Sequence, residues 1–543
     1  MTQCIAIYDI SGIQSFIFST NKLREMVGGS KIVHKILFEL LPKKLGYEKD
    51  NWEDEDFSEK IPSPFNPEDI KGRFGNVIYI GGGNALVLYE NEKSYQSVTI
   101  ELQKEVFELS GGGIRLCHAK IEIDHLNQKG SFVEKIQKPL MQALTTYKQN
   151  TAPIQTARGF AFGAQDNETK EPIVLVPTLK DSPCKYASYG RFKKNEIFYS
   201  TRDEKSSERI SKYYADNFEQ FRDEGEKSFV AVIHIDGNTM GKQIIDFAKK
   251  NEENATLFDQ LQNMRELSKE ISKIYRDTLD STVNEIFKKE IETEKAYRAA
   301  QQLTKNIPYR EIIADGDDIT VIIKSQKALP FCELFVQTLD KERKKDGTYP
   351  HLQDFHISVG IGIAFVHDKF PFSTAYDIAE QLCKNAKKRG LEYQFRKNNI
   401  AVTHSSMDFQ IVKSGMTTDI KNFRASNYYL DKNNQEPKCL LRRPYLYIKE
   451  NNNTIPKEYT YSNFIDTHTE LVNLGIANNK LKAFQHAYAT SEMEIDYVIQ
   501  MIKARKKCEL QPWMGNKATY FDILDVWDYL KGGQIDENLT TDD

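Results

Sequence analysis

The sequence has no paired cysteines, no long hydrophobic run and no large excess of charge of one sign. Its seven cysteines are scattered singly, and none lies close enough to another to form CxxC. Neither a disulfide framework nor a zinc ribbon is indicated. The longest apolar runs, at residues 229–235 and 357–366, are far shorter than the roughly 20 residues that cross a bilayer. We therefore expect no membrane span.

The net charge of −4 excludes the strong positive field of a protein that binds nucleic acid unaided. Any contact with nucleic acid must therefore involve a local part of the surface or be shared with partner proteins. The first residues, CIAIYDI, read as a core strand rather than a secretion signal, which predicts a cytoplasmic location. With 543 residues, 40% of them hydrophobic, the chain is expected to be a multidomain globular protein.

An internal repeat is the most informative feature of the chain. An apolar run that ends in Asp and leads into a helical pattern occurs twice, as CIAIYDISGIQSF and as FVAVIHIDGNTMGKQI. Each copy is followed by two short apolar strands around a tight turn, GGGN at residues 81–84 and DGDD at residues 315–318. A helical segment, a further β-rich run and another helix then follow each hairpin.

This order of strand, helix, hairpin, helix and strand is that of the ferredoxin-like or palm fold. The predicted fold class is α+β, with two palm domains, a connector and a helical C-terminal domain. The predicted boundaries are residues 1–130 for the first palm, 131–225 for a mixed, largely helical connector, 226–400 for the second palm and 401–543 for the C-terminal domain.

Three carboxylates mark the second palm. Asp236 ends its first strand, and Asp317 and Asp318 lie about 80 residues further on, at the hairpin tip. Because neighbouring strands are roughly 5 Å apart, the three side chains are expected to cluster. Two Mg²⁺ or Mn²⁺ ions about 4 Å apart would neutralise the cluster and catalyse nucleotidyl transfer. An acidic turn standing alone is usually only a hairpin tip, but the matched strand and the repeat favour a metal site.

The turn after Asp236 opens a helix, so its backbone N–H groups can point at a triphosphate. Lys387, in the helix after the strand HISVGIGIAFV, is either a second phosphate ligand or a solvated helix end. Short basic clusters at residues 384–389, 442–443 and 503–507 are expected to be solvated faces or partner contacts. The predicted nucleotide-binding residues are Gly237, Asn238, Thr239, Gly241, Lys242, Gly316 and Lys387.

The first copy keeps Asp9 but has Gly83 and Asn84 where the second copy has Asp317 and Asp318. It should bind metal poorly. Its turn either supplies one wall of a nucleotide pocket or is a permissive turn without a ligand.

These motifs together resemble the large polymerase/cyclase subunit of type III CRISPR effector complexes, most closely the Cmr (III-B) kind. The resemblance rests on DISGIQSFIF, KLREMVGGSKIV, GGGNALVLY, IDGNTMGK, ADGDDITVI in place of a GGDD turn, and the run from SVGIGIAF to PFSTAYDIAEQLCKNAKKRG. They cover most of residues 4–405.

The resemblance implies a subunit that converts ATP into a signalling nucleotide when its complex binds target RNA. The product would be a cyclic oligoadenylate or a conjugate of AMP with S-adenosylmethionine. Asp236, Asp317 and Asp318 would be the metal ligands. The other subunits, the guide RNA and the target RNA would be partners through the complex.

The chain departs from the family at three places. Asp315 stands where the family has the first Gly of its turn. The HD nuclease domain that often precedes the first palm is not expected here, because the first palm strand starts at residue 4, and cleavage of target DNA by this chain is not expected either. The zinc ribbon between the palms is missing as well, so no zinc cofactor is expected.

Three alternatives remain open. Both palms could be a non-catalytic scaffold, although the presence of all three carboxylates speaks against it. A stand-alone GGDEF-like diguanylate cyclase shares the palm, but that family prefers Glu-Phe where this chain has Ile319 and Thr320. A template-directed RNA polymerase would need a long basic channel segment, which the sequence lacks.

Overall fold

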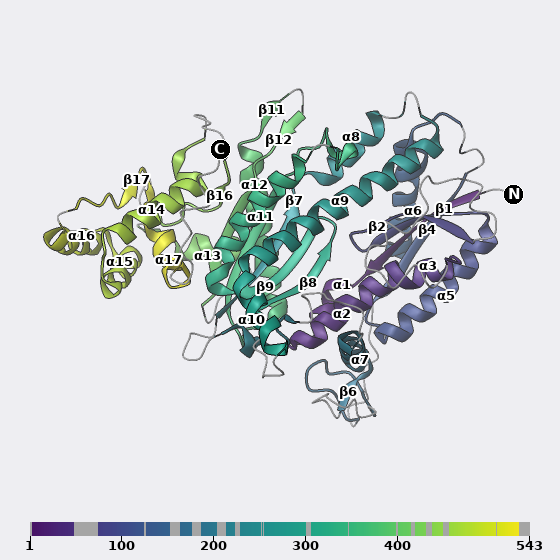
Figure 1. Ribbon diagram of the computed structural model, residues 1–543, viewed down its shortest axis with the longest axis horizontal. Helices are drawn as coiled ribbons and strands as arrows, with labels where there is room; N and C mark the ends of the chain where they lie inside the picture. The colour runs from purple at the N-terminus through teal and green to yellow at the C-terminus, as the bar shows by residue number, and fades with distance from the viewer. Residues whose placement is uncertain are drawn as a thin grey trace.

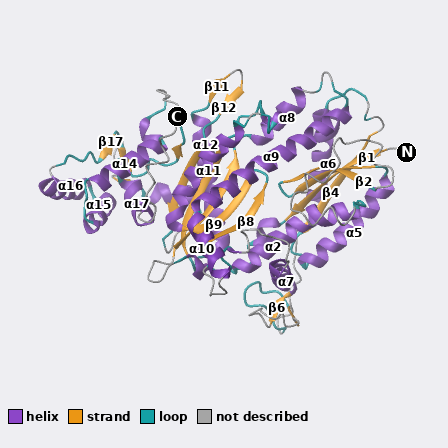
Figure 2. Ribbon diagram, viewed as in Figure 1, coloured by secondary structure: helices purple, strands orange, loops and turns teal. Residues whose placement is uncertain are grey.

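The computed structural model has an α+β architecture in which two sheets lie side by side and helices cover their faces (Figures 1 and 2). The first sheet lies toward the N-terminus and the second occupies the centre of the molecule. The structure describes residues 3–47, 74–123, 126, 128–152, 163–175, 186–203, 213–222, 229–250, 252, 255–299, 306–345, 347–397, 400–413, 419–430, 437–448, 455–506 and 508–530.

The first sheet has the strand order β2-β3-β1-β4 and is antiparallel throughout. Its strands are β1 (Gln3–Ser11), β2 (Gly75–Gly81), β3 (Asn84–Tyr89) and β4 (Arg115–Ile123). The helical segments of this part are α1 (Ile13–Ile17), α2 (Leu23–Lys35), η1 (Ile36–Leu40), α3 (Leu41–Lys44), α5 (Glu92–Ser110), η4 (Val133–Gln137) and α6 (Lys138–Asn150).

The second sheet has the order β16-β13-β10-β7-β9-β8. Its strands are β7 (Phe229–Gly237), β8 (Tyr309–Asp315), β9 (Asp318–Lys324), β10 (Val359–His367), β13 (Ser406–Ile411) and β16 (Tyr445–Leu446). Its helices are α8 (Met240–Lys250), α9 (Leu257–Ile286), α10 (Lys288–Ala299), α11 (Ala328–Arg343) and α12 (Phe372–Glu392).

The repeat predicted from the sequence is present in the topology. The order β8-β9-β7-β10 in the second sheet reproduces β2-β3-β1-β4 in the first, with equivalent crossovers. The predicted α+β class with two palm-type sheets is therefore confirmed. β13 pairs in parallel with β10, so the second sheet continues past residue 400, where we placed a boundary. The domain boundaries themselves stay predictions.

The segment between the palms contains β5 (Ile173–Leu175), β6 (Tyr186–Ser188), α7 (Tyr189–Asp203) and the short η6 (Phe218–Phe221). Its helix α7 packs against α2, where a Cβ on Gly28 would lie 1.9 Å from the Lys194 carbonyl oxygen. Part of the predicted connector, at residues 204–212 and 223–225, lies outside the described residues.

The C-terminal part is mostly helical and lies at the opposite end of the molecule from the first sheet (Figure 1). Its helices are α13 (Ile420–Asn427), α14 (Tyr461–Asn473), α15 (Asn478–Thr490), α16 (Glu492–Lys506) and α17 (Phe521–Leu530). The remaining strands are β11 (Phe395–Lys397), β12 (Ile400–Val402), β14 (Tyr429–Leu430), β15 (Lys438–Cys439), β17 (Trp513–Met514) and β18 (Lys517–Ala518).

One expectation for this part is wrong. Arg442 and Arg443 are buried rather than solvated. The guanidinium of Arg443 lies 3.3 Å from Asp522 and 3.2 Å from Asp525, both on α17, so paired carboxylates compensate its charge inside the fold. No described helix is long and apolar enough to cross a membrane.

The largest hydrophobic cluster of the described residues contains side chains from both palms. It contains Ile7 and Leu86 from the first sheet together with Ile233 from the second and Leu261 from α9. Helix α9 of the second palm also lies against β2 of the first. Apolar burial between the sheets therefore fixes how the two hairpin tips meet.

Candidate active site

The three predicted carboxylates lie at one edge of the second sheet. β7 and β9 pair in register up to Ile235 and Ile319, and the β8–β9 turn closes with Asp315 opposite Asp318. Asp236 follows Ile235 on β7, so it stands beside the hairpin tip that carries Asp317 and Asp318. Gly316 has φ 63°, a left-handed conformation that suits glycine and allows this tight turn.

Burial, and then repulsion between carboxylates, raises the pKa values of Asp317 and Asp318. The pKa of Asp317 rises to about 6, first because of burial and then because of the charge of Asp236. The pKa of Asp318 rises to about 7, again through burial first and then through Asp236 and Asp317. A carboxylate whose pKa is raised in this way is stabilised in its ionised form by a cation beside it.

The donor set fits divalent cations. Among the described residues, Asp318 Oδ1 is buried without a hydrogen-bond partner, and the Asp318 side chain as a whole is 42% exposed. The hydroxyl of Tyr275, which lies beside Gly237, is likewise buried and unpartnered in that set. Carboxylate oxygens are the ligands that Mg²⁺ and Mn²⁺ prefer. That these residues bind metal stays a prediction.

Lys387 is part of this cluster and is not a solvated helix end. Its Nζ lies 2.5 Å from Asp236 Oδ2 and donates to the carbonyl oxygen of Gly237 at 2.8 Å. Two glycines of β10 allow α12 to come this close. A Cβ on Gly360 would lie 2.4 Å from Lys387 Cγ, and one on Gly362 would lie 2.0 Å from a carbonyl oxygen of α12.

The turn between β7 and α8 leads directly into the N-terminus of a helix. Thr239 has φ 55°, which is uncommon for a residue with a side chain, and α8 begins at Met240. Asn238 is buried, and its amide donates to Ser358 Oγ at 3.0 Å, so it fixes the turn. Gly241 and Lys242 are exposed at the start of α8. Their contact with a nucleotide stays a prediction.

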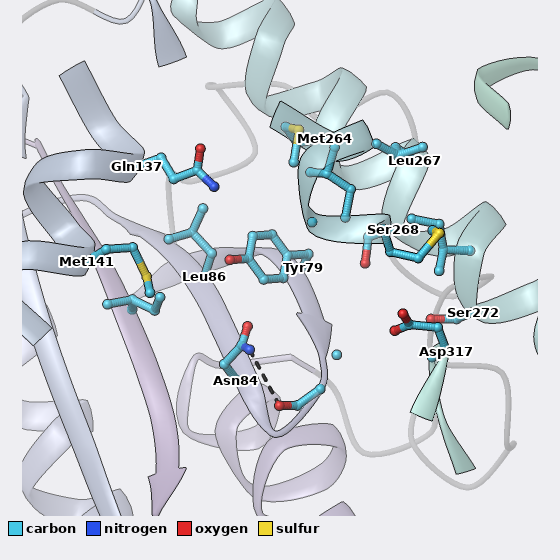
Figure 3. A pocket seen from close by; sticks show the side chains of 18 of the residues that line it. Tyr79, Asn84, Leu86, Gln137, Met141, Met264, Leu267, Ser268, Ser272 and Asp317 are labelled. Carbon is cyan, nitrogen blue, oxygen red and sulfur yellow. Dashed lines mark hydrogen bonds between the residues drawn. The ribbon is translucent and has the colours of Figure 1, made fainter. Parts of the chain in front are cut away.

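A cavity of about 360 Å³ lies between the two palms and reaches this edge. Figure 3 shows Tyr79 and Leu86 of the first palm facing Met264 and Ser268 of α9, with Asp317 at one end. Its wall is mostly apolar. Volume and lining are those of a small-molecule site. The full lining is Ile7, Tyr79, Gly81, Gly82, Asn84, Leu86, Phe132, Ile136, Gln137, Leu140, Met141, Met240, Gly241, Ile244, Met264, Leu267, Ser268, Ile271, Ser272, Gly316 and Asp317.

The two hairpin tips are joined directly. The backbone N–H of Gly83 donates to Asp315 Oδ2 at 3.1 Å. Asp315 is the residue that replaces the first glycine of the family turn, so this departure serves a contact between the palms. In the first palm, Asp9 pairs with Lys148 at 2.7 Å. A side-chain ammonium therefore already compensates the one carboxylate that the first palm retains at this position.

Several residues of the site were missed by reasoning from the sequence. His234 and Cys383 lie next to Asp236, and Tyr275 lies next to Gly237. The signal for the first two was the alternation of Gly360 and Gly362 on one face of a strand, which indicates that a helix approaches closely. No comparable signal marks Tyr275.

Residues 229–401 match the family model described as Cas10/Cmr2, second palm domain. No curated protein matches the chain. The apo Csm1-Csm4 cassette matches over 97% of this chain and 70% of its own, with 11% identity and a TM-score of 0.47. The cassette in complex with cA3 matches over 72% of this chain, with 11% identity and a TM-score of 0.39.

The chain thus spans about half the length of the cA3-bound chain, of which 53% is covered. The family match falls on the sheet that carries Asp236, Asp317 and Asp318, and it does not distinguish the Cmr kind from the Csm kind. Residues 229–401, which carry the three carboxylates, are therefore a second palm domain of the Cas10/Cmr2 type.

Proposed function

We propose that the chain is a metal-dependent nucleotidyltransferase that converts ATP into a signalling nucleotide with release of pyrophosphate. One observation carries this proposal. Asp317 belongs to the wall of a cavity that both palms line, and Asp236 and Asp318 lie close enough to Asp317 to form one cluster of charge with it. A reactive phosphate held at the carboxylates would thus have its nucleoside in a mostly apolar pocket.

Each group has a role in this proposal. Asp236, Asp317 and Asp318 would hold two Mg²⁺ or Mn²⁺ ions, which would supply charge compensation for the attacking oxygen and the leaving pyrophosphate. The N-terminus of α8 and the loop at Thr239 and Gly241 point backbone N–H groups at the triphosphate. Lys387, released from Asp236, would bind a phosphate oxygen.

The apolar walls of Tyr79, Leu86 and Met264 would bind the base and keep water from the reacting atoms. As a subunit of a type III CRISPR complex in the cytoplasm, the chain would act when the complex, with its guide RNA, binds target RNA. The product would be a cyclic oligoadenylate or an AMP conjugate such as one with S-adenosylmethionine.

The test is turnover of radiolabelled ATP by the assembled complex with target RNA. Mg²⁺ and Mn²⁺ are compared, each with and without S-adenosylmethionine. The Asp317→Ala/Asp318→Ala variant should lose every product. Asp9→Ala, which removes the corresponding carboxylate of the first palm, is the matched control and should keep them. An intact complex that makes no product under any of these conditions would leave the scaffold as the function.

A further inference from the structure

Three side chains of different ligand chemistry converge beside the carboxylate cluster. One ligand atom each from His234, Asp236 and Cys383 lies within 4.8 Å of the other two. His234 and Asp236 alternate on β7 and so point to the same face of the sheet. Cys383 reaches that face from α12. His234 and Cys383 have no part in the nucleotidyl transfer proposed above.

The fold brings this trio together through two glycines. Gly362 pairs with His234 and Gly360 pairs with Asp236 in the β7–β10 ladder. Because neither glycine carries a side chain on this face, α12 lies directly on β10. The thiol of Cys383 donates to the carbonyl oxygen of Gly360 at 3.2 Å. Its sulfur is thereby held next to Asp236.

A fourth oxygen is available at the same place. Asp318 Oδ1 lies 3.6 Å from His234 Nδ1 and, within the described part of the chain, has no hydrogen-bond partner. Imidazole, thiolate and two carboxylates are four donors of the types that zinc binds in tetrahedral sites. Mg²⁺ does not favour sulfur. Atoms that share a tetrahedral zinc are about 3.5 Å apart, so shifts of roughly 1 Å would close the site.

We propose that His234, Asp236 and Cys383, with Asp318 as the fourth ligand, form an inhibitory site for Zn²⁺ and similar thiophilic cations. On binding, the Cys383 thiol releases its proton to solvent, and Lys387 leaves Asp236 while it keeps the Gly237 carbonyl oxygen. The ion takes Asp236 and Asp318 away from the Mg²⁺ or Mn²⁺ pair. This cation would be a regulator rather than a resident cofactor. Its binding stands on the geometry alone, and its inhibitory effect rests on the proposed function.

Binding is tested on the purified chain without ATP, with Co²⁺ as the spectroscopic probe. The wild type should show a thiolate-to-cobalt charge-transfer band, and Zn²⁺ should displace it. Cys383→Ser should lose the band. His234→Gln should weaken binding by at least about tenfold, because even second-shell changes commonly cost that much. Cys508→Ser removes a thiol in the C-terminal part and should keep the band.

Thermal unfolding of each variant shows whether it is folded, and His234→Gln tests the site even if Cys383→Ser does not fold. Absence of the band in the wild type, or its persistence in folded Cys383→Ser, would overturn the site. Inhibition is then measured as ATP turnover by the complex in Mg²⁺ with added Zn²⁺, relative to each variant's own zinc-free rate. Cys383→Ser should need at least about tenfold more Zn²⁺.

Equal sensitivity of the wild type and Cys383→Ser would refute the inhibitory role. A complex that turns over no ATP even without Zn²⁺ would refute the proposed function instead, and the cobalt result would still decide the site.

Discussion

Replacing Asp318 by Asn should stabilise the metal-free protein above neutral pH while it abolishes turnover. The folded-state pKa of Asp318 is raised from 3.8 to about 7, mainly by burial and then by Asp236 and Asp317. A raised carboxyl pKa means that the folded state binds a proton more readily than the unfolded chain. The stability from this group is fully present below the unfolded pKa and is lost as pH rises through about 7.

The size of the effect follows from the shift and from solvent exposure. A shift of about 3 pKa units corresponds to an upper limit of about 4 kcal/mol. Since the side chain is 42% exposed, solvent screens the repulsion, and about 1 kcal/mol at pH 8 is the expected gain for Asp318→Asn. That gain corresponds to about 2 °C in melting temperature for a domain of this size.

The assay is thermal unfolding in a chelator at pH 8 and at pH 4.5. The difference between Asp318→Asn and the wild type should be largest at pH 8 and several times smaller at pH 4.5, where the folded-state carboxyl is protonated. Asp496→Asn, an exposed change on α16, is the matched control. Added Mg²⁺ at ten times its Kd should raise the free energy of unfolding of the wild type by about 1.4 kcal/mol, seen as a higher melting temperature, and should have a much smaller effect on Asp318→Asn. A variant less stable than the wild type at pH 8, or a difference independent of pH, would refute this account.

Three further changes test the geometry of the site. Gly362→Ala forces its Cβ to 2.0 Å from the α12 backbone and should cost at least about 1–3 kcal/mol of stability, measured by denaturant unfolding, whereas Gly81→Ala meets no described atom within 4 Å and should not. Asp315→Gly restores the family residue but removes the bond from Gly83, so it should lower the melting temperature by an amount equivalent to about 1 kcal/mol and raise the KM for ATP. Lys387→Gln should raise that KM about tenfold through loss of a phosphate contact; an unchanged KM would remove Lys387 from the nucleotide site.

The sequence was sufficient for the repeat and for the position of the carboxylates. Both follow from local rules, namely period-two apolar strands and acidic or glycine-rich turns between them. Asp236, Asp317 and Asp318 could be placed at one sheet edge because a strand end and a hairpin tip meet there in any palm. The extension of the sheet by β13 was missed, since it pairs in parallel with β10 across α12 and leaves no local pattern.

The surroundings of the carboxylates could not be predicted in the same way. Whether Lys387 was a ligand or a solvated helix end depended on how closely α12 approaches β10, and that distance is set by Gly360 and Gly362 together. The surroundings of Arg443 could not be predicted either, because they also depend on contacts between segments far apart in the sequence. From the sequence alone, a pair of adjacent arginines is expected to be exposed to solvent. In the fold, Asp522 and Asp525, about 80 residues further along the chain, lie next to Arg443 and pair with it.

The degenerate first palm is best understood through the cavity rather than through metal binding. Its Asp9 is neutralised by Lys148, so it has little electrostatic need for a cation. Its strands nevertheless supply Tyr79 and Leu86 to the cavity wall. The second palm alone would leave its carboxylates beside an open surface. Because burial is the main cause of the raised pKa of Asp317, the first palm, by covering this edge, helps to hold the cluster in the state that favours a cation.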